Sequence, residues 1–192
     1  NTAGDSSGNG NTGSIFPSTS TPTWVTGKVS GALSFNGTNN YVQTPSTSNF
    51  SVGTGDFSFS VWTKPNSFSS YYHMFAYDAN QNTGALKANI NDGVIYYYAS
   101  GFTTDGTITQ SLQSGVWNHV VFVRRANVAE LYWNGVLKGT KSGFNNNYTG
   151  SYYLRFGNGW TTEMANGLMD DIRFYNRALS AVEIYALYSA TR

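Results

Sequence analysis

The sequence predicts an all-β protein, an antiparallel two-sheet jelly-roll sandwich with one short C-terminal helix. Three observations predict this fold class. About a dozen short alternating or apolar runs follow one another, and turn residues separate them about every ten residues. Helical periodicity is almost absent before the C-terminus. No repeat of fixed period occurs, which argues against a propeller or a β-helix.

The first 23 residues contain mainly Gly, Asn, Ser and Thr, with Ile15 and Phe16 as almost the only apolar side chains. This composition predicts a loop segment over residues 1–23. The later runs predict strands, in chain order, at residues 32–35, 41–43, 57–62, 73–77, 86–90, 94–99, 108–112, 117–124, 129–133, 136–141 and 152–156.

Two local signals are especially clear. Residues 131–138 predict a hairpin, because two apolar runs flank an Asn-Gly pair suited to a type I′ turn. Residues 180–188 predict the helix, because Ser180 precedes it and Glu183 stands three residues later, as in a capping box.

The last predicted strand contains an acid that requires explanation. Ile172 and Phe174 alternate with Arg173 and Tyr175, so one side of this strand should face the core. Asp170 has the same phase as Ile172 and is predicted to face the core too. A carboxylate there costs several kcal/mol unless it is paired, hydrogen-bonded or bound to a cation.

Composition excludes several classes of protein. Charged residues make up 11% of the chain and the formal net charge is +1, so no nucleic-acid partner is expected. The absence of cysteine removes disulfides, thiolate metal sites and a cysteine nucleophile. No apolar run approaches the roughly 20 residues of a membrane helix, so no membrane insertion is expected. The first residues do not have the features of a signal peptide, and a mature or trimmed chain is expected.

Six segments occur in a fixed order along the chain, at residues 5–13, 31–37 with 41–42, 57–62, 117–121, 131–136 and 170–179. Together they resemble the laminin-G-like domains of the concanavalin A-like lectin/glucanase superfamily, in particular the variety common in bacterial extracellular proteins. The resemblance implies a single jelly-roll domain over residues 1–192. It is specific for the fold and weak for the ligand.

The chain departs from this family at its start. Members usually have an apolar strand before the Asp-Ser-Ser-Gly segment, and here only residues 1–4 precede it. Either that strand has been trimmed, or the chain lacks it and leaves a sheet edge open. An open edge could accept a strand from another subunit.

The resemblance also implies a structural calcium ion that joins the N-terminal loop to the last strand. By position, Asp5, Asn9 and Asp170 would supply side-chain oxygens, with carbonyl groups around residues 8–11 completing the shell. Calcium accepts six to eight such oxygens in flexible geometry. In the alternative interpretation, Asp5 begins an Asx-type turn and Asp170 accepts hydrogen bonds from backbone amides.

Catalysis is not expected. Jelly-roll glycoside hydrolases use two carboxylates, commonly at short alternating spacing on one strand. None of the three glutamates stands two or four residues from another acid. Asp170 and Asp171 are adjacent, so a strand should send them to opposite faces, with Asp171 pairing with Arg173. His73 has no catalytic neighbour, and His119 is expected to be packed and hydrogen-bonded.

Aromatic and amide side chains are the groups that sugars require, because ring faces stack on pyranose rings and amides bind hydroxyl groups. Trp160 lies in a Gly/Asn/Thr segment and is the best single candidate for an exposed aromatic anchor. Tyr97 shares the phase of Ile95, which leaves Tyr96 and Tyr98 on the other face. The predicted ligand-binding residues are Trp160, Tyr148, Tyr152, Tyr96, Tyr98, Tyr71, Tyr72 and Asn158.

Two functions follow. The first is a secreted, non-catalytic recognition module that binds a polysaccharide or other glycan, with calcium as a structural ion. The second is a structural or adhesive subunit of a cell-surface layer or filament, which assembles through its sandwich edges with other copies or with a cell-surface protein. Both functions predict an extracellular or cell-surface location.

Overall fold

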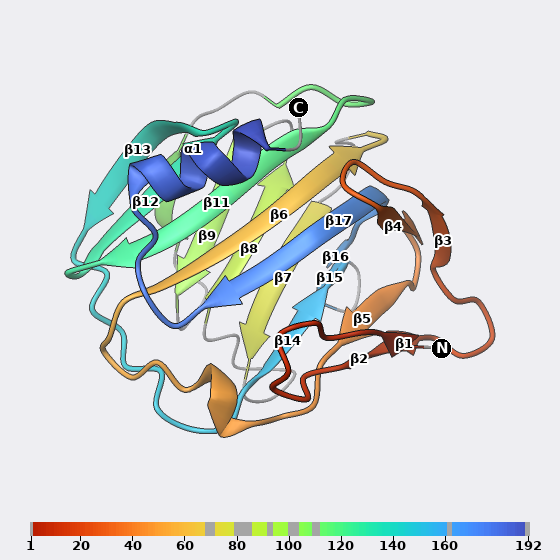
Figure 1. Ribbon diagram of the computed structural model, residues 1–192, viewed down its shortest axis with the longest axis horizontal. Coiled ribbons are helices and arrows are strands. Elements are labelled where there is room, and N and C mark those ends of the chain that lie inside the picture. Colours follow the sequence, from red (N-terminus) through yellow and green to blue (C-terminus); the bar gives the residue numbers. More distant parts are fainter. Residues whose placement is uncertain are drawn as a thin grey trace.

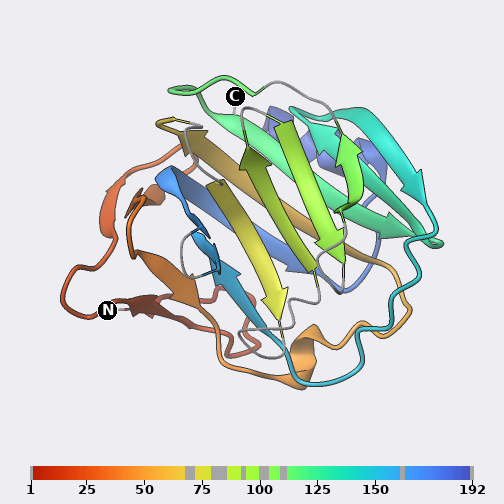
Figure 2. The same cartoon turned by 180° about the vertical axis from the view of Figure 1, so that it is seen from behind.

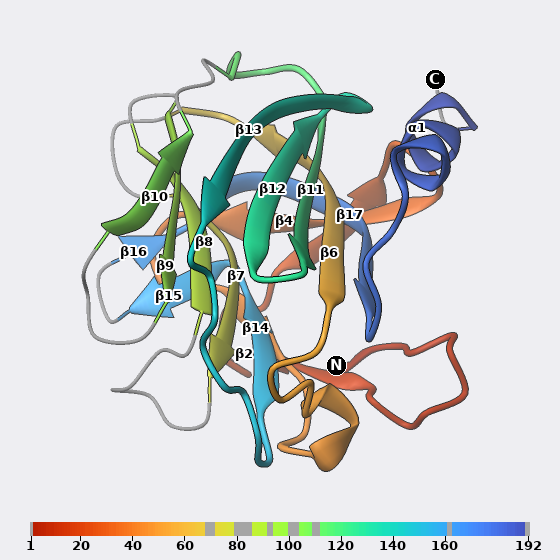
Figure 3. The same ribbon diagram turned by 90° about the vertical axis from the view of Figure 1, so that its left-hand side faces the viewer.

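Two antiparallel sheets lie face to face with the hydrophobic core between them, and Figure 3 shows them edge-on. The structure is a computed structural model, and it describes residues 2–67, 72–78, 86–91, 94–99, 104–108, 112–160 and 163–190. The predicted fold class, an all-β jelly-roll sandwich with one short helix, is confirmed. In the described part of the chain, no helix is long and apolar enough to cross a membrane.

The eight-stranded sheet is seen from its outer side in Figure 2. In spatial order it contains β1 (Thr2–Ala3), β2 (Gly13–Phe16), β5 (Tyr41–Gln43), β14 (Tyr153–Phe156), β7 (Tyr72–Asp78), β8 (Leu86–Asn91), β9 (Val94–Ala99) and β10 (Thr104–Ile108). A separate pair consists of β15 (Asn158–Trp160) and β16 (Glu163–Met164).

The seven-stranded sheet faces the viewer in Figure 1. In spatial order it contains β13 (Val136–Ser142), β12 (Val128–Trp133), β11 (Asn118–Arg125), β6 (Phe57–Pro65), β17 (Asn166–Tyr175), β4 (Gly31–Asn36) and β3 (Thr23–Thr26). A short 3₁₀ helix, η1 (Ser48–Phe50), leads toward β6, and α1 (Ala181–Ser189) follows β17.

Most predicted strands are observed within a few residues of their expected bounds. The N-terminal segment differs, because residues 2–3 and 13–16 form short strands where a loop was predicted. Ile15 is buried in the core, which holds β2 in the sheet despite its polar neighbours. The strand predicted at 108–112 lies partly outside the described residues, and β10 ends at Ile108.

Side chains of β6 alternate between two faces, one toward the core between the sheets and one toward α1. Phe57, Phe59 and Val61 belong to the core between the sheets. Ser58 and Ser60 point the other way, and the hydroxyl of Ser58 donates a hydrogen bond to the carbonyl of residue 177. The outer face of this sheet is therefore also covered.

Helix α1 covers the outer face of the seven-stranded sheet and lies across β11 and β12 (Figure 1). Ile184 and Leu179 pack against Val121, Val123 and Tyr132 in a second apolar cluster. The predicted capping box at the start of α1 is confirmed, since the N-cap serine and the glutamate three residues later bond each other's backbone N–H.

His119 lies on this outer side and is 1% exposed, so the prediction that it is packed is confirmed. Its Nε2 atom is 2.9 Å from the hydroxyl oxygen of Ser60, and its ring lies 5.0 Å from that of Trp62. Burial, with a smaller contribution from the charge of Arg173, lowers the pKa of His119 to about 4.

We expect the free energy of unfolding to fall by about 2 kcal/mol between about pH 7.5 and pH 5 because of His119. Its pKa falls from an ordinary value of 6.5 to about 4 in the folded chain. Between these values the unfolded chain binds a proton that the folded chain does not. The stabilisation is therefore complete above the unfolded pKa and is lost as the pH falls toward the folded one.

Urea unfolding of the wild type and His119→Gln across this pH range measures the effect. The variant should lose about 2 kcal/mol less than the wild type, because glutamine does not titrate. Equal losses in the two proteins would contradict the assignment.

Candidate functional site

The closing strand β17 contains a bulge that reverses the predicted orientation of Asp170. β17 has one residue more than β6 between two paired positions, and Asp171 adopts a positive φ of 45°. The two pairs are Asp170 with Trp62 and Arg173 with Ser60. Met169 belongs to the core and Ile172 packs against it, so Asp170 faces the outer side of the seven-stranded sheet. The prediction that Asp170 faces the core was wrong because the bulge shifts the strand phase.

Asp170 instead holds the loop between β3 and β4. Its Oδ2 atom accepts hydrogen bonds from the backbone N–H groups of Lys28 and Val29, each at 2.8 Å, and of Ser30 at 3.4 Å. Its Oδ1 atom accepts one from the N–H of Asp171 at 2.7 Å. The backbone-amide interpretation of Asp170 therefore describes its contacts.

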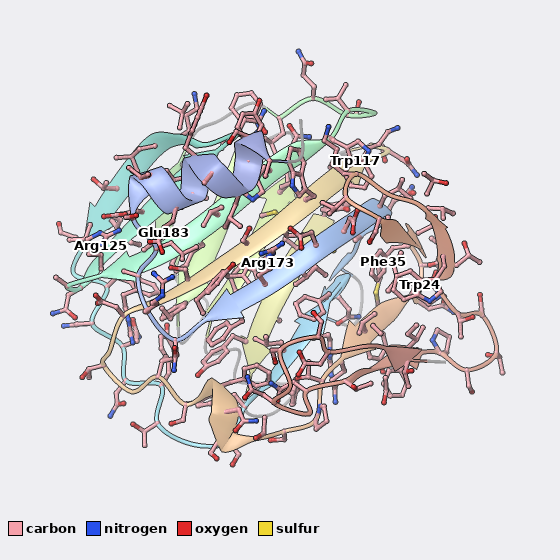
Figure 4. All side chains as sticks on the ribbon, in the orientation of Figure 1. Trp24, Phe35, Trp117, Arg125, Arg173 and Glu183 are labelled. Carbon is pink, nitrogen blue, oxygen red and sulfur yellow. The ribbon has the colours of Figure 1, made fainter. Side chains whose placement is uncertain are left out.

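The neighbouring acid Asp171 makes the ion pair that the sequence predicted. Its Oδ1 atom lies 2.8 Å from Nε of Arg173, and Arg173 is on the outer face of β17 (Figure 4). Neither adjacent acid is free to act with the other on a substrate.

The N-terminal loop is ordered by its own hydrogen bonds. Asp5 accepts from the N–H and the hydroxyl of Ser7 and from the N–H of Asn11, each at 2.9 Å. The Asn11 bond, followed by the Ser7 bonds, lowers the pKa of Asp5. The carbonyl of Asn9 accepts a hydrogen bond from the amide of Asn49 at 3.2 Å. The predicted Asx-type turn describes this loop.

These contacts do not fit a calcium shell. Calcium requires six to eight oxygens turned toward one point, whereas the carboxylates of Asp5 and Asp170 face N–H donors. Within the described ranges, no three acidic, histidine or cysteine side chains come together. Calcium binding therefore stays a prediction of the sequence.

Several predicted ligand-binding residues lie in the core. Tyr148 is 2% exposed and Tyr152 is 8% exposed, and both rings pack on Tyr77 at centroid distances of 5.3 and 4.5 Å. Tyr72 is buried, and its hydroxyl accepts a hydrogen bond from Thr63 at 2.8 Å. Buried rings cannot stack on a sugar, which argues against ligand contact by these three residues.

The other predicted aromatic residues lie outside the described residues or have side chains that the structure does not describe. Tyr71 lies outside the described residues, and the side chains of Tyr96, Tyr98 and Trp160 are not described. Their ligand-binding roles stay predictions. The strand register places Tyr96 opposite residue 89 and Tyr98 opposite residue 87 in the eight-stranded sheet.

A cluster of aromatic and polar groups, four half-buried and two buried, lies on β2, β5 and β14 of the eight-stranded sheet and on the neighbouring strand β15. Ile15, Val42 and Leu154 point from these strands into the core, so their sequence neighbours face outward. We call this cluster the Arg155 platform, and its members are Phe16, Tyr41, Gln43, Tyr153, Arg155 and Asn158.

Ring contacts build the platform. The rings of Phe16 and Tyr41 stack at a centroid distance of 4.8 Å and an interplanar angle of 13°. The guanidinium of Arg155 lies 5.0 Å from the ring centroid of Tyr41 and 5.2 Å from that of Tyr153. Arg155 therefore joins two aromatic rings through cation–π contacts.

Hydrogen bonds fix the orientation of Arg155. Its Nε and Nη2 atoms donate to Oε1 of Gln43 at 3.1 and 2.7 Å, and Nη1 lies 3.4 Å from Oδ1 of Asn158. Asn158 is buried, and its own amide donates to the sulfur of Met164 at 2.9 Å. A fixed guanidinium between the half-buried ring of Tyr41 and the buried ring of Tyr153 can donate hydrogen bonds to a hydroxyl-rich, uncharged ligand.

Sequence reasoning found Asn158 and missed the rest of the platform. A period-2 reading of residues 41–43 and 153–156 could have placed Tyr41 and Arg155 on outward faces. Nothing in the sequence joins the two strands, because Gln43 and Arg155 are 112 residues apart.

A laminin-G family model, described as the Concanavalin A-like lectin/glucanases superfamily, matches residues 36–185. No curated protein sequence matches the chain. Many solved structures do, and they are similar in fold at low sequence identity.

One is domain 4 of AbnA, a GH43 extracellular arabinanase from Geobacillus stearothermophilus, in complex with arabinotriose. It is 22% identical with a TM-score of 0.80, over 96% of this chain and 91% of that chain. The SAP-like pentraxin of Limulus polyphemus is 17% identical with a TM-score of 0.69, over 82% and 81%. The binding domain of botulinum neurotoxin DC in complex with SialylT is 15% identical with a TM-score of 0.71, over 98% of this chain and 48% of that chain.

Proposed function

The chain belongs to the concanavalin A-like lectin/glucanases superfamily, and we propose that it is a non-catalytic module that binds a carbohydrate on the Arg155 platform. The observation that carries the proposal is the fixed guanidinium between the rings of Tyr41 and Tyr153. The arabinanase domain, which is similar in fold, is described in complex with arabinotriose. This supports a carbohydrate as the class of ligand.

The chemistry of the platform favours a neutral sugar. The ring of Tyr41 is half-buried, with Phe16 stacked on it and the Arg155 guanidinium over it, so the part that remains available to a sugar is its exposed edge. Arg155 and Gln43 lie beside it with N–H and carbonyl groups at fixed positions. Such groups bind sugar hydroxyls and set the orientation of the ring.

The proposed module is non-catalytic because its adjacent acids are engaged elsewhere. Asp170 holds backbone amides of the β3–β4 loop, and Asp171 pairs with Arg173. The similar structures include an arabinanase domain and a toxin binding domain, which supports a role as a binding part of a larger protein. An extracellular location is part of the proposal, supported by the description of the arabinanase as extracellular.

We expect Tyr41→Ala to weaken glycan binding about tenfold, or about 1.4 kcal/mol, because it removes the exposed part of the ring and the cation–π contact that helps to hold Arg155. Arg155→Met should weaken binding by a similar factor, since it keeps the bulk and loses the hydrogen bonds. The measurement is a glycan array that includes arabino-oligosaccharides and sialylated glycans, followed by calorimetry on the best ligand. Melting temperatures show that the variants remain folded.

Trp24→Ala is the matched control. Trp24 is 56% exposed on β3, in the other sheet, and is labelled in Figure 4. This variant should bind the glycan as the wild type does. Loss of binding in Trp24→Ala, with binding kept in Tyr41→Ala, would place the glycan elsewhere and overturn the proposal. Trp160→Ala tests the sequence prediction in the same assay.

A further inference from the structure

Two buried side chains with unpartnered polar atoms pack against each other on the outer face of the seven-stranded sheet. Strand pairing places His119 of β11 opposite Trp62 of β6, and their rings are 5.0 Å apart. Nδ1 of His119 and Nε1 of Trp62 have no hydrogen-bond partner among the residues that the structure describes. Such atoms are rare in protein interiors, because burying them costs hydrogen bonds to water.

The last turn of α1 covers this pair. The ring of Tyr188 stacks on that of Trp62 at a centroid distance of 5.8 Å and on that of His119 at 6.2 Å, with interplanar angles of 25° and 20°. On the helix side, water reaches His119 only if this turn moves away. From this arrangement we infer that α1 is a pH-sensitive cover, which closes over neutral His119 and is released when His119 binds a proton.

The closed arrangement has no place for the proton. Nε2 of His119 lies 2.9 Å from the hydroxyl oxygen of Ser60. A protonated imidazole donates from both ring nitrogens, so Nδ1 would become a buried donor without an acceptor in the described part of the chain. Burial and the charge of Arg173 hold the pKa of His119 at about 4, whereas a ring in water has a pKa of 6.5.

The elements around His119 bring cations and no free acid. Nζ of Lys28 lies 5.2 Å from the ring centroid of Trp62, Lys64 follows Trp62 on the same face of β6, and Arg173 comes from β17. From α1, the titratable group that faces His119 is the phenol of Tyr188. The described acids of this face are engaged elsewhere, Asp170 with loop amides, Asp171 with Arg173, Glu130 with Arg125 and Glu183 with Arg177.

Helix α1 is held by few contacts, so its release should cost less than unfolding of the sandwich. Ile184 is its one buried side chain, and Leu187 packs only partly against the same cluster. Release would uncover Val121, Val123 and Tyr132, which lie beneath the helix. Acidic surroundings would therefore expose an apolar surface on the seven-stranded sheet. This surface lies on the opposite sheet from the Arg155 platform, so the inference goes beyond the proposed glycan site.

No other group explains a response between pH 7.5 and pH 5. The pair with Arg177 and the hydrogen bonds of Ser180 lower the pKa of Glu183 to about 2, so the start of α1 keeps its charge at pH 5. The second histidine of the chain, His73, lies on β7 in the other sheet. The proton that releases α1 is therefore assigned to His119.

NMR hydrogen exchange on the full chain measures the release. At pH 7.5, amides of residues 185–189 should be less protected than those of β6, because the helix opens without unfolding of the sandwich. From pH 7.5 to pH 5, after correction for intrinsic exchange rates, the opening constant of α1 should rise about thirtyfold. This factor follows from a pKa of 6.5 in the open state and about 4 in the closed state.

Three variants test the cause. His119→Gln should abolish the pH dependence of the opening constant, because glutamine does not titrate. Tyr188→Ala removes the covering ring and should raise the pKa of His119, measured by NMR titration, from about 4 toward 6.5, because helix docking and proton binding are linked. Val182→Ala is the matched control, since this side chain is 79% exposed on the same helix, and it should leave the pKa of His119 unchanged.

Four outcomes overturn the inference. They are equal protection of α1 and β6 at pH 7.5, an opening constant that does not change with pH, the same rise in His119→Gln, and a pKa of His119 that Tyr188→Ala leaves unchanged. Melting temperatures show whether the variants are folded. The first two outcomes are measured on the wild type and stand even if a variant does not fold.

Discussion

Arg124→Ala is expected to lower the free energy of unfolding by about 4 kcal/mol. Arg124 has 0% exposure, although arginine is almost never fully buried in proteins. Its guanidinium lies 4.9 Å from the ring centroid of Phe57 and 5.2 Å from that of Tyr148. The substitution removes both cation–π contacts and leaves a cavity between the two rings.

The larger part of this loss comes from backbone carbonyls. Arg124 donates hydrogen bonds to the carbonyl oxygens of Gly53, Gly55 and Asn146, which belong to two separate loops. These part-buried hydrogen bonds have a charged donor, and bonds of that kind contribute about 1.5–3 kcal/mol each. Burial lowers the pKa of Arg124, and its three carbonyl partners offset part of the cost of burying the cation.

Arg125→Ala is the matched control on the same strand. The side chain of Arg125 is 40% exposed, pairs with Glu130 at 2.9 Å and donates one hydrogen bond to the carbonyl of Leu179 at 2.7 Å. An exposed ion pair contributes about 1 kcal/mol or less and one carbonyl hydrogen bond about 1 kcal/mol, so this variant should lose about half as much stability as Arg124→Ala or less. Urea unfolding of both variants measures the difference. If the two variants lost equal stability, the carbonyl contacts of Arg124 would not be the cause.

Local patterns were enough to predict the fold. The apolar residues of β6 alternate with serines, and the structure turns Phe57 and Phe59 to the core as expected. The hairpin at residues 131–138 has positive φ at both Asn134 and Gly135, at 50° and 79°, as a type I′ turn requires. These features depend on neighbours in the sequence, so a single sequence contains them.

The candidate sites depended on long-range contacts that the sequence does not contain. The segment before β14 returns to the sandwich, so Tyr148 and Tyr152 are buried although their Asn- and Gly-rich surroundings suggested exposure. The Arg155 platform forms only when β5 and β14 pair. The bulge at Asp171 has no marker in the residues themselves, because aspartate also occurs in regular strands.

Asp170→Ala should lower the free energy of unfolding by about 3 kcal/mol, because it leaves several backbone N–H groups without an acceptor. Asp170 accepts hydrogen bonds from Lys28, Val29 and Ser30. The adjacent Gly27 fits closely, since a Cβ atom there would lie 2.3 Å from Oδ2 of Asp170. The loss should therefore also loosen the β3–β4 hairpin, measured as faster hydrogen exchange at residues 28–30.

Calcium separates the two interpretations of Asp170. If the carboxylate serves the loop amides alone, the loss of stability is the same in calcium and in chelator, and calcium does not raise the melting temperature of the wild type. Asp171→Asn is the control, because asparagine tolerates the positive φ and the half-exposed pair with Arg173 contributes about 1 kcal/mol or less. A calcium-dependent rise in the melting temperature that Asp170→Ala abolishes and Asp171→Asn retains would show that Asp170 binds the ion. The loop amides would then have to turn away from Oδ2, so the exchange rates at residues 28–30 would change with calcium as well.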